Sequence, residues 1–315
     1  MVYLVAGGAG FIGTNYCLYF LNSKIHKDDI LVVVDKLSYA SNNVIKELSN
    51  DKNIIFIKED IRKYNKMNEI FKKYTFDYVI NFAAETHVDT SIKKPELFIK
   101  NNIDITLNLL KLSLKYHVKR FHQISTDEVY GATRLDSTYA FKESDPLNPT
   151  NPYSVSKASS DLLTLSFFKT YGLNVTISRS SNNFGPYQNE EKLIPLVIKR
   201  ALNNEMIPVY GNGNNVRDWL YVKDHVYALD QVILKGRAGE IYNISSHNEF
   251  SNIKLILFIL AFLKKDTSLI KFVKDRKGHD ERYALNTDKL YKEIGVHFAD
   301  KNFLIDLSSY IQDFK

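Results

Sequence analysis

Residues 2–13, Val2-Tyr3-Leu4-Val5-Ala6-Gly7-Gly8-Ala9-Gly10-Phe11-Ile12-Gly13, decide the fold of this chain. The first five are typical of a buried strand, and glycines at 7 or 8, 10 and 13 lead into a helical pattern. Glycine permits a tight turn and lets backbone N–H groups approach a pyrophosphate at a helix start. A glycine-rich turn without a ligand is the alternative. Asp35, at the end of the next strand, favours a dinucleotide site.

The amino-terminal half alternates strand and helix patterns. The strand patterns are Val2–Ala6, Ile30–Val34, Ile54–Ile57, Tyr78–Phe82, Phe121–Ser125 and Val175–Ser178, and the helical patterns are Phe11–Leu21, Val44–Leu48, Met67–Tyr74, Pro95–Tyr116 and Pro152–Tyr171. This order predicts an α/β fold with a doubly wound parallel sheet of the Rossmann type. We expect residues 1–180 to form the dinucleotide-binding domain, rejoined by part of 216–245. Residues 181–315 should form a smaller carboxyl-terminal substrate-binding domain.

Composition excludes several classes of protein. With 315 residues, 44% hydrophobic and 25% charged, the chain reads as an ordinary globular protein. The net charge of +6 raises nucleic-acid binding as an alternative, but the lysines and arginines are scattered, which favours a solvated surface. The single cysteine, Cys17, and the absence of a membrane-length apolar run predict a soluble cytoplasmic protein without a membrane partner. No His/Cys/Asp spacing supports a metal site.

Asp35 predicts which dinucleotide binds. A carboxylate there accepts hydrogen bonds from the adenosine ribose hydroxyls and repels a 2′-phosphate, so NAD is favoured over NADP. The adjacent Lys36 leaves NADP open. Asp60 and Ile61 follow the third strand, where an acid can meet the adenine amino group; a plain loop acid is the alternative.

Tyr153 and Lys157 form a candidate proton-transfer pair. Asn151 and Pro152 mark a helix start, and four-residue spacing places Tyr153 and Lys157 on one helical face. A free tyrosine has a pKa near ~10, and a neighbouring ammonium stabilises its phenolate. The same spacing occurs by chance on many helices. The dinucleotide site upstream favours catalysis.

The run Thr126-Asp127-Glu128 adds a second acid and base. It ends a predicted strand, and in open α/β sheets ligands sit at the carboxyl ends of strands. Two adjacent carboxyl groups acquire different pKa values when one is desolvated or when both share a site. Loop or helix-cap roles are the alternative. Together with the pair at 153 and 157, the run predicts an alcohol-oxidising enzyme that also removes water.

Seven sequence runs resemble the nucleotide-sugar 4,6-dehydratases, within the extended short-chain dehydrogenase/reductases. The likeness covers nearly the whole chain, and its most specific part is the Thr-Asp-Glu run. The runs are Gly7-Gly8-Ala9-Gly10-Phe11-Ile12-Gly13, Asp35-Lys36-Leu37-Ser38-Tyr39-Ala40, Ser125-Thr126-Asp127-Glu128-Val129-Tyr130-Gly131, Tyr153-Ser154-Val155-Ser156-Lys157-Ala158, Asn182-Asn183-Phe184-Gly185-Pro186-Tyr187, Arg217-Asp218-Trp219-Leu220-Tyr221-Val222 and Asp275-Arg276-Lys277-Gly278-His279-Asp280.

The resemblance implies a lyase that converts a glucose nucleotide, dTDP-glucose or UDP-glucose, into its 4-keto-6-deoxy form with NAD. Tyr153 would take the carbon 4 hydroxyl proton, assisted by Lys157 and Thr126. Glu128 would remove the carbon 5 hydrogen, and Asp127 would protonate the leaving carbon 6 hydroxyl. The implied cofactor contacts are Gly7, Gly10, Phe11, Ile12, Asp35, Lys36, Ser38, Asp60, Ile61, Ala83, Ala84, Tyr153 and Lys157. The implied substrate contacts are Thr86, Asn182, Lys192, Arg217, Asn248, Arg276 and His279.

The resemblance also implies a homodimer that packs Pro95–Tyr116 and Pro152–Tyr171 as four helices. The chain departs from the family pattern at Thr90, usually arginine, and in the short stretch Ala132–Lys142. Two other functions remain open. A 4-epimerase or decarboxylase of the same superfamily needs the Tyr–Lys pair but not both acids. A non-catalytic NAD-binding protein would be indifferent to changes at Glu128.

Overall fold

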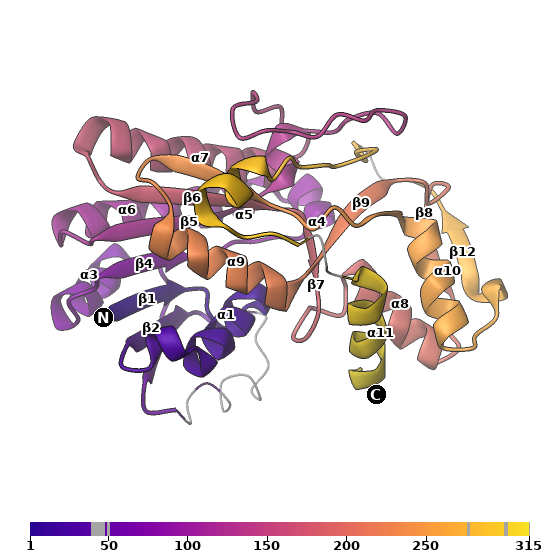
Figure 1. Cartoon of the computed structure of the whole chain (residues 1–315), viewed down its shortest axis with the longest axis horizontal. Coiled ribbons are helices and arrows are strands. Elements are labelled where there is room, and N and C mark those ends of the chain that lie inside the picture. The colour runs from indigo at the N-terminus through magenta and orange to yellow at the C-terminus, as the bar shows by residue number, and fades with distance from the viewer. Residues whose placement is uncertain (39–47, 49–50, 276–277, 299–301, 315) are drawn as a thin grey trace.

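The computed structural model describes residues 1–38, 48, 51–275, 278–298 and 302–314. Its main feature is a seven-stranded sheet in the order β10-β6-β5-β4-β1-β2-β3, in which every neighbouring pair is parallel (Figure 1). The strands are β1 Val2–Ala6, β2 Ile30–Asp35, β3 Ile54–Lys58, β4 Tyr78–Asn81, β5 Arg120–Thr126, β6 Val175–Ser180 and β10 Glu240–Ile244. The predicted doubly wound parallel sheet is confirmed.

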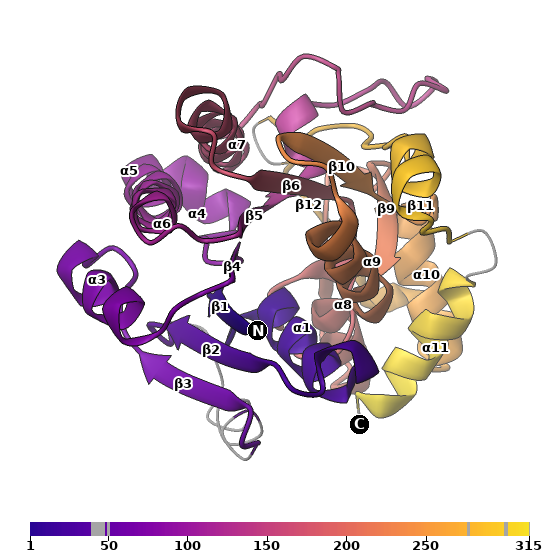
Figure 2. The same cartoon turned by 60° about the vertical axis from the view of Figure 1, so that its left-hand side comes forward.

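Helices cover both faces of this sheet (Figure 2). Strand side chains alternate between faces, and β1 shows the consequence. Tyr3 and Val5 join the core under one helical layer, whereas Leu4 and Ala6 join the core under the other. The first layer is α1 Phe11–Asn22 and α9 Val222–Lys235; the second is α3 Tyr64–Lys73, α4 Val88–Lys93, α5 Pro95–Phe98, α6 Asp104–Lys115 and α7 Pro152–Tyr171.

Helix α7 begins and ends where its sequence requires. The Asn151 side chain accepts a hydrogen bond from the Ser154 N–H at 2.9 Å, and the Ser154 hydroxyl accepts one from the Asn151 N–H at 3.2 Å. This capping box and Pro152 at the first turn fix the start. Gly172, with φ of 69°, terminates the helix. The site residues Tyr153 and Lys157 therefore lie in its first two turns.

The helical pattern expected over 95–116 is interrupted. Between α5 and α6 the chain forms a π-helical turn, η2 (Ile99–Ile103). Its residues Asn101 and Asn102 are almost fully buried, and both hydrogen-bond to Glu85 beyond the end of β4. Wide turns of this kind occur often at functional sites. Periodicity does not reveal them, because the apolar spacing around the turn stays helical.

The carboxyl-terminal part builds a second, smaller core beside the carboxyl ends of the large sheet (Figure 1). It contains a three-stranded sheet in the order β11-β9-β7 and a parallel pair of β12 with β8. Its elements are β7 Asn182–Phe184, α8 Leu193–Leu202, β8 Ile207–Tyr210, β9 Val216–Tyr221, β11 Glu249–Ser251, α10 Asn252–Phe262, β12 Ile270–Val273 and α11 Phe303–Asp313. Between these elements the chain returns to the large sheet as β10.

Two findings bear on the remaining expectations. The helix predicted at Val44–Leu48 lies outside the described residues except for Leu48, which is buried. Among the helices in the described ranges, none combines the length and the hydropathy needed to cross a bilayer.

Candidate active site

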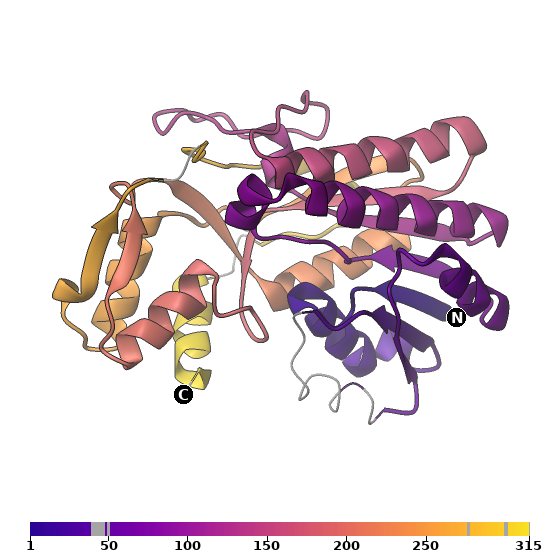
Figure 3. The ribbon, with the colours of Figure 1, turned by 180° about the vertical axis from the view of Figure 1, so that it is seen from behind.

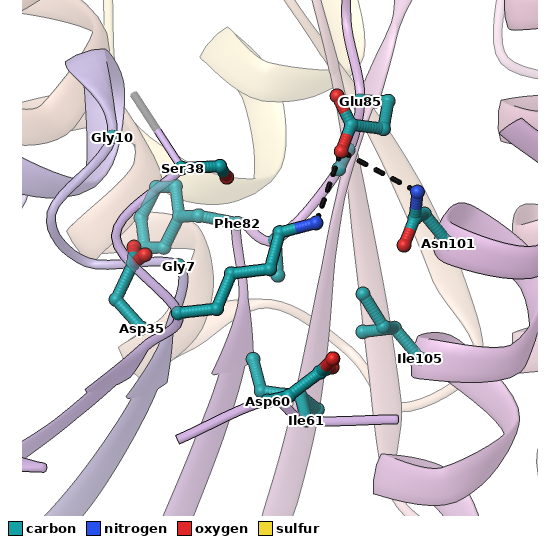
Figure 4. A pocket seen from close by; sticks show the side chains of 13 residues that line it. Gly7, Gly10, Asp35, Ser38, Asp60, Ile61, Phe82, Glu85, Asn101 and Ile105 are labelled. Carbon is teal, nitrogen blue, oxygen red and sulfur yellow. Dashed lines mark hydrogen bonds and ion pairs between the residues drawn. The ribbon is translucent and has the colours of Figure 1, made fainter. Parts of the chain in front are cut away.

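A small cavity lies at the carboxyl ends of β1, β2 and β4 (Figure 4). The strand order reverses between β1 and β4, and ligands in open α/β sheets bind at such a switch point. The cavity measures about 90 Å³. Its lining includes predicted cofactor residues Gly7, Gly10, Asp35, Lys36, Ser38, Asp60, Ile61, Ala83 and Ala84.

The glycine turn has the shape that a pyrophosphate requires. Gly7 has φ of +77°, and a Cβ on it would lie 2.6 Å from the backbone of Ala83. Gly10 is the N-cap of α1 and makes no side-chain capping bond. The helix therefore begins at the cavity wall, where the N–H groups of its first turn have no acceptor within the helix, and it has no acidic residue in that turn. These residues fit a dinucleotide.

Asp35 is oriented by the backbone. Its carboxylate accepts hydrogen bonds from the Leu37 N–H at 2.7 Å and from the Ala9 N–H at 3.1 Å. Burial raises the pKa of Asp35, and these two N–H groups and Lys36 offset part of that effect. One lone pair on each oxygen remains available for a ribose hydroxyl.

A second cavity, of about 290 Å³, brings together all five predicted catalytic residues. Thr126 ends β5, and Asp127 and Glu128 begin the 3₁₀ turn η3 (Asp127–Tyr130). Tyr153 and Lys157 project from α7. Gly7, Gly10, Phe11, Ile12 and Ala84 line the same cavity, so the glycine turn and the catalytic residues share one space.

Lys157 is held against the β5 backbone. Its Nζ donates a hydrogen bond to the Ile124 carbonyl at 2.5 Å. Burial lowers the pKa of Lys157 to about 8, while Asp161, one turn further along α7, opposes this effect. Burial also raises the pKa of Tyr153, as do the charges of Glu128 and Asp127, whereas a hydrogen bond with Thr126 lowers it.

Asp127 and Glu128 occupy different surroundings. Asp127 Oδ1 accepts a hydrogen bond from the Thr126 hydroxyl at 3.1 Å, and Oδ2 is buried without a hydrogen-bond partner in the described part of the chain. Burial and Glu128 raise the pKa of Asp127 well above its ordinary value. Burial raises the pKa of Glu128 too, but a 3.3 Å hydrogen bond from Asn151 and the charge of Arg217 oppose it. Asp127 is therefore suited to hold a proton and Glu128 to accept one.

A wider cleft of about 470 Å³ extends from Glu128 into the carboxyl-terminal part. Five predicted substrate residues line it: Thr86, Asn182, Lys192, Arg217 and His279. Arg217 lies with its guanidinium 4.3 Å from the centre of the Tyr283 ring and donates hydrogen bonds to the carbonyls of Val216 and Asp280, at 2.8 and 2.9 Å. This support fixes a cation beside the acid–base pair.

Two predicted substrate residues are not placed on the cleft. Arg276 lies outside the described residues. Asn248 is absent from the cleft lining; its side chain donates to the Ser246 hydroxyl at 2.9 Å, and its backbone bonds to Asp218 and Trp219. It braces the turn before β11.

The structure adds residues that the sequence reasoning assigned no chemistry. Asn151 was predicted only as a helix cap but also contacts Glu128. Asp161, one turn after Lys157 on α7, accepts hydrogen bonds from Ser125 and from Arg179, both at 2.9 Å. Asp161 and Arg179 thus form a buried ion pair next to the catalytic residues. The four-residue spacing from Lys157 to Asp161 was a signal available in the sequence. Tyr283 had none, because its contact with Arg217 joins segments far apart.

Within the described ranges, no cluster of three or more His, Cys, Asp or Glu side chains has the arrangement of a metal site.

Comparisons with known proteins agree with this geometry. The family model described as GDP-mannose 4,6 dehydratase matches residues 4–298. A dTDP-glucose 4,6-dehydratase of Haemophilus influenzae is 44% identical, covering 93% of this chain and 91% of that protein. The crystal structure of a dTDP-glucose 4,6-dehydratase from Streptomyces venezuelae, with NAD bound, is 38% identical and superposes with a TM-score of 0.94 over 99% of this chain and 96% of that one.

The fold alone is shared more widely. A UDP-glucose 4-epimerase from Thermotoga maritima is 28% identical and superposes with a TM-score of 0.90 over 100% of this chain and 98% of the other. The predicted resemblance is nevertheless confirmed by the family match and by the identity to the dehydratases. The chain belongs to the nucleotide-sugar 4,6-dehydratase family and is related to its dTDP-glucose 4,6-dehydratases.

Proposed function

We propose that this protein is an NAD-dependent lyase that dehydrates dTDP-glucose to the 4-keto-6-deoxy sugar nucleotide. One observation carries the proposal: the Tyr153–Lys157 pair and two carboxyl groups with different surroundings line a single cavity. The relatives are dTDP-glucose 4,6-dehydratases, which supports the choice of substrate. They give no specific support for UDP-glucose.

NAD, held by the glycine turn and Asp35, would supply the hydride chemistry needed at carbons 4 and 6. Tyr153 accepts the proton of the carbon 4 hydroxyl, and Thr126 orients that hydroxyl. The Lys157 ammonium stabilises the phenolate. The hydrogen bond from Lys157 Nζ to the Ile124 carbonyl holds the ammonium in a fixed position.

The ketone at carbon 4 acidifies the hydrogen on carbon 5, so elimination follows oxidation. Glu128 takes this hydrogen as a proton, because Asn151 and Arg217 favour its charged form. Asp127 gives its proton to the carbon 6 hydroxyl, which leaves as water. Glu128 then returns its proton to carbon 5 when hydride is added at carbon 6. Without Asp127 and Glu128, oxidation at carbon 4 would leave the carbon 6 hydroxyl of the sugar in place.

We propose that the two parts of the chain divide the ligands between them. Residues 1–180 with β10 would hold the cofactor, and most of 181–315 would hold the nucleotide sugar. In the wide cleft, Arg217 and Lys192 are cations suited to a diphosphate, and Thr86, Asn182 and His279 offer polar contacts.

A homodimer through α6 and α7 is also proposed. These helices lie side by side on one face of the sheet (Figure 3). Val155 and Leu162, seven residues apart on α7, are 40% and 59% exposed, and Ile99 in η2 is 44% exposed. Apolar side chains on an open helical face are typical of a self-associating surface. Leu162→Glu should yield a monomer by light scattering; an unchanged mass would contradict this interface.

The test of the activity is incubation with dTDP-glucose followed by mass spectrometry. The proposal predicts a product lighter by one water, with Glu128→Gln as the inactive control. UDP-glucose, added in equal amount, should be consumed more slowly. An epimerised sugar of unchanged mass would support the superfamily alternative, and no reaction in any arm would support a non-catalytic protein.

A further inference from the structure

Lys36 is the residue that leaves the choice between NAD and NADP open, because it is a cation next to the ribose-binding Asp35. In the structure, the Lys36 ammonium is 3.1 Å from Glu85 Oε1. Lys36 follows β2 and Glu85 follows β4, so the ion pair joins two walls of the small cavity. The Lys36 ammonium therefore forms an ion pair with the Glu85 carboxylate, which comes from the opposite wall of the cavity.

Three hydrogen bonds with two asparagines hold Glu85 in place. Its N–H donates to the Asn102 side chain at 2.8 Å, and its carbonyl accepts from the same side chain at 3.1 Å. Asn101 donates to Glu85 Oε1 at 3.4 Å (Figure 4). Both asparagines sit in the π-helical turn and are at most 2% exposed. The Glu85 side chain is 8% exposed and that of Lys36 32%, so the buried and hydrogen-bonded acid sets the position of the more exposed lysine.

The charges around the cavity favour a neutral ribose. The lining contains the acids Asp35, Asp60 and Glu85 and the base Lys36. Arg62 does not line the cavity, but its guanidinium donates hydrogen bonds to both carboxylate oxygens of Asp60 and so adds a second positive charge next to it. Three negative and two positive groups leave one net negative charge. A 2′-phosphate would meet Asp35 directly and would have to take Lys36 from Glu85, leaving a buried carboxylate without its cation.

We propose that Glu85 is a specificity-determining residue: by holding the Lys36 ammonium across the cavity, it prevents that lysine from binding a 2′-phosphate and so excludes NADP. This inference rests on the proposed use of NAD. It assigns a task to Glu85 beyond Asp35, whose carboxylate repels the phosphate. Without Glu85's charge the cavity rim becomes neutral and Lys36 is free to act as a phosphate ligand.

The test compares the wild type with Glu85→Gln, an isosteric change that keeps an oxygen for Asn101. Nucleotides extracted with acid from the purified proteins are quantified as the ratio of NADP to NAD. The shift of the unfolding temperature with added NADP gives a second readout. One charge-assisted hydrogen bond predicts a rise of the ratio of roughly tenfold or more. Glu85→Asp, which withdraws the carboxylate by one methylene, should give a smaller rise.

Two controls assign the effect to the ion pair. Glu96→Gln removes an exposed acid on α5 outside the cavity and should leave the ratio unchanged. Adding Lys36→Met to Glu85→Gln should abolish the rise, because the phosphate ligand is gone. A ratio unaltered in Glu85→Gln and Glu85→Asp, or a rise that survives Lys36→Met, would overturn the inference. A wild type that carries neither nucleotide would instead contradict the proposed function.

Discussion

Asn151 performs two tasks that substitutions can separate. Its side-chain oxygen caps α7 through the Ser154 N–H, while its side-chain nitrogen donates to Glu128 at 3.3 Å. Serine at 151 keeps a capping oxygen but has no donor that reaches Glu128. Alanine loses both. We therefore predict that Asn151→Ser loses the Glu128 contact and keeps the cap, and that Asn151→Ala loses both.

The magnitudes follow from these contacts. A hydrogen bond to a charged group contributes roughly 1.5–3 kcal/mol, and a 3.3 Å bond belongs at the lower end. Because this bond favours the charged form of Glu128, its loss raises the pKa of that base. At about 1.4 kcal/mol per pH unit, the acid limb of kcat/KM should move to higher pH by about one unit. Loss of the cap should cost about 1 kcal/mol of unfolding free energy.

The assay is kcat/KM for dTDP-glucose against pH, together with urea unfolding, for the wild type and both variants. Both variants should show the displaced acid limb and should unfold at lower urea than the wild type, because both lose the bond to Glu128. Asn151→Ala should be the less stable of the two by the capping energy. An acid limb identical to that of the wild type in both variants would refute the assignment of Glu128 as the base tuned by Asn151. Equal stability of Asn151→Ala and Asn151→Ser would refute the capping energy.

Three further changes test the surroundings of the site. Lys157→Met should be inactive yet more stable at pH 7 by up to about 3 kcal/mol, since burial lowers the pKa from 10.5 to about 8. That gain should shrink between pH 8 and 10.5, where the unfolded wild type holds a proton that the folded one has released; urea unfolding at several pH values checks it. Gly7→Ala places a Cβ 2.6 Å from backbone atoms at φ +77° and should cost at least about 1–3 kcal/mol and reduce bound NAD, measured by thermal unfolding and nucleotide extraction. Asp161→Asn breaks a buried pair with Arg179 and should cost roughly 3–5 kcal/mol in urea, whereas Asp136→Asn, in an ion pair more than 70% exposed, should change stability by less than ~0.5 kcal/mol.

Local sequence signals predicted six of the seven strands of the large sheet, because each is short and bounded by helix or turn residues. The seventh, β10, was expected only as part of residues 216–245 rejoining the first domain. The strand at Val2–Ala6 and the helix at Pro152–Tyr171 were predicted to the residue, since Gly7 ends the first and Asn151 and Gly172 bound the second. The π-helical turn escaped prediction. Its cause is a tertiary contact, the burial of Asn101 and Asn102 against Glu85, which leaves no periodic trace.

The same distinction applies to the site. Motif spacing indicated the five catalytic candidates, because each follows a strand end or a helix start. The contacts that tune them join distant segments. Arg217 reaches Tyr283 across 66 positions of the chain, and Arg179 in β6 reaches back to Asp161 in the preceding helix α7. Such pairings depend on how β9 and α7 pack, which hydrophobic pattern alone does not specify.

The most direct test of the central claim follows one hydrogen atom. dTDP-glucose carrying deuterium at carbon 4 is incubated with the protein. Mass spectrometry gives the mass of the product, and NMR shows which carbon carries the deuterium. If Tyr153, Asp127 and Glu128 act in sequence in one cavity, the product loses one water and carries the deuterium at carbon 6. Deuterium retained at carbon 4 of an intact or epimerised sugar would contradict the account.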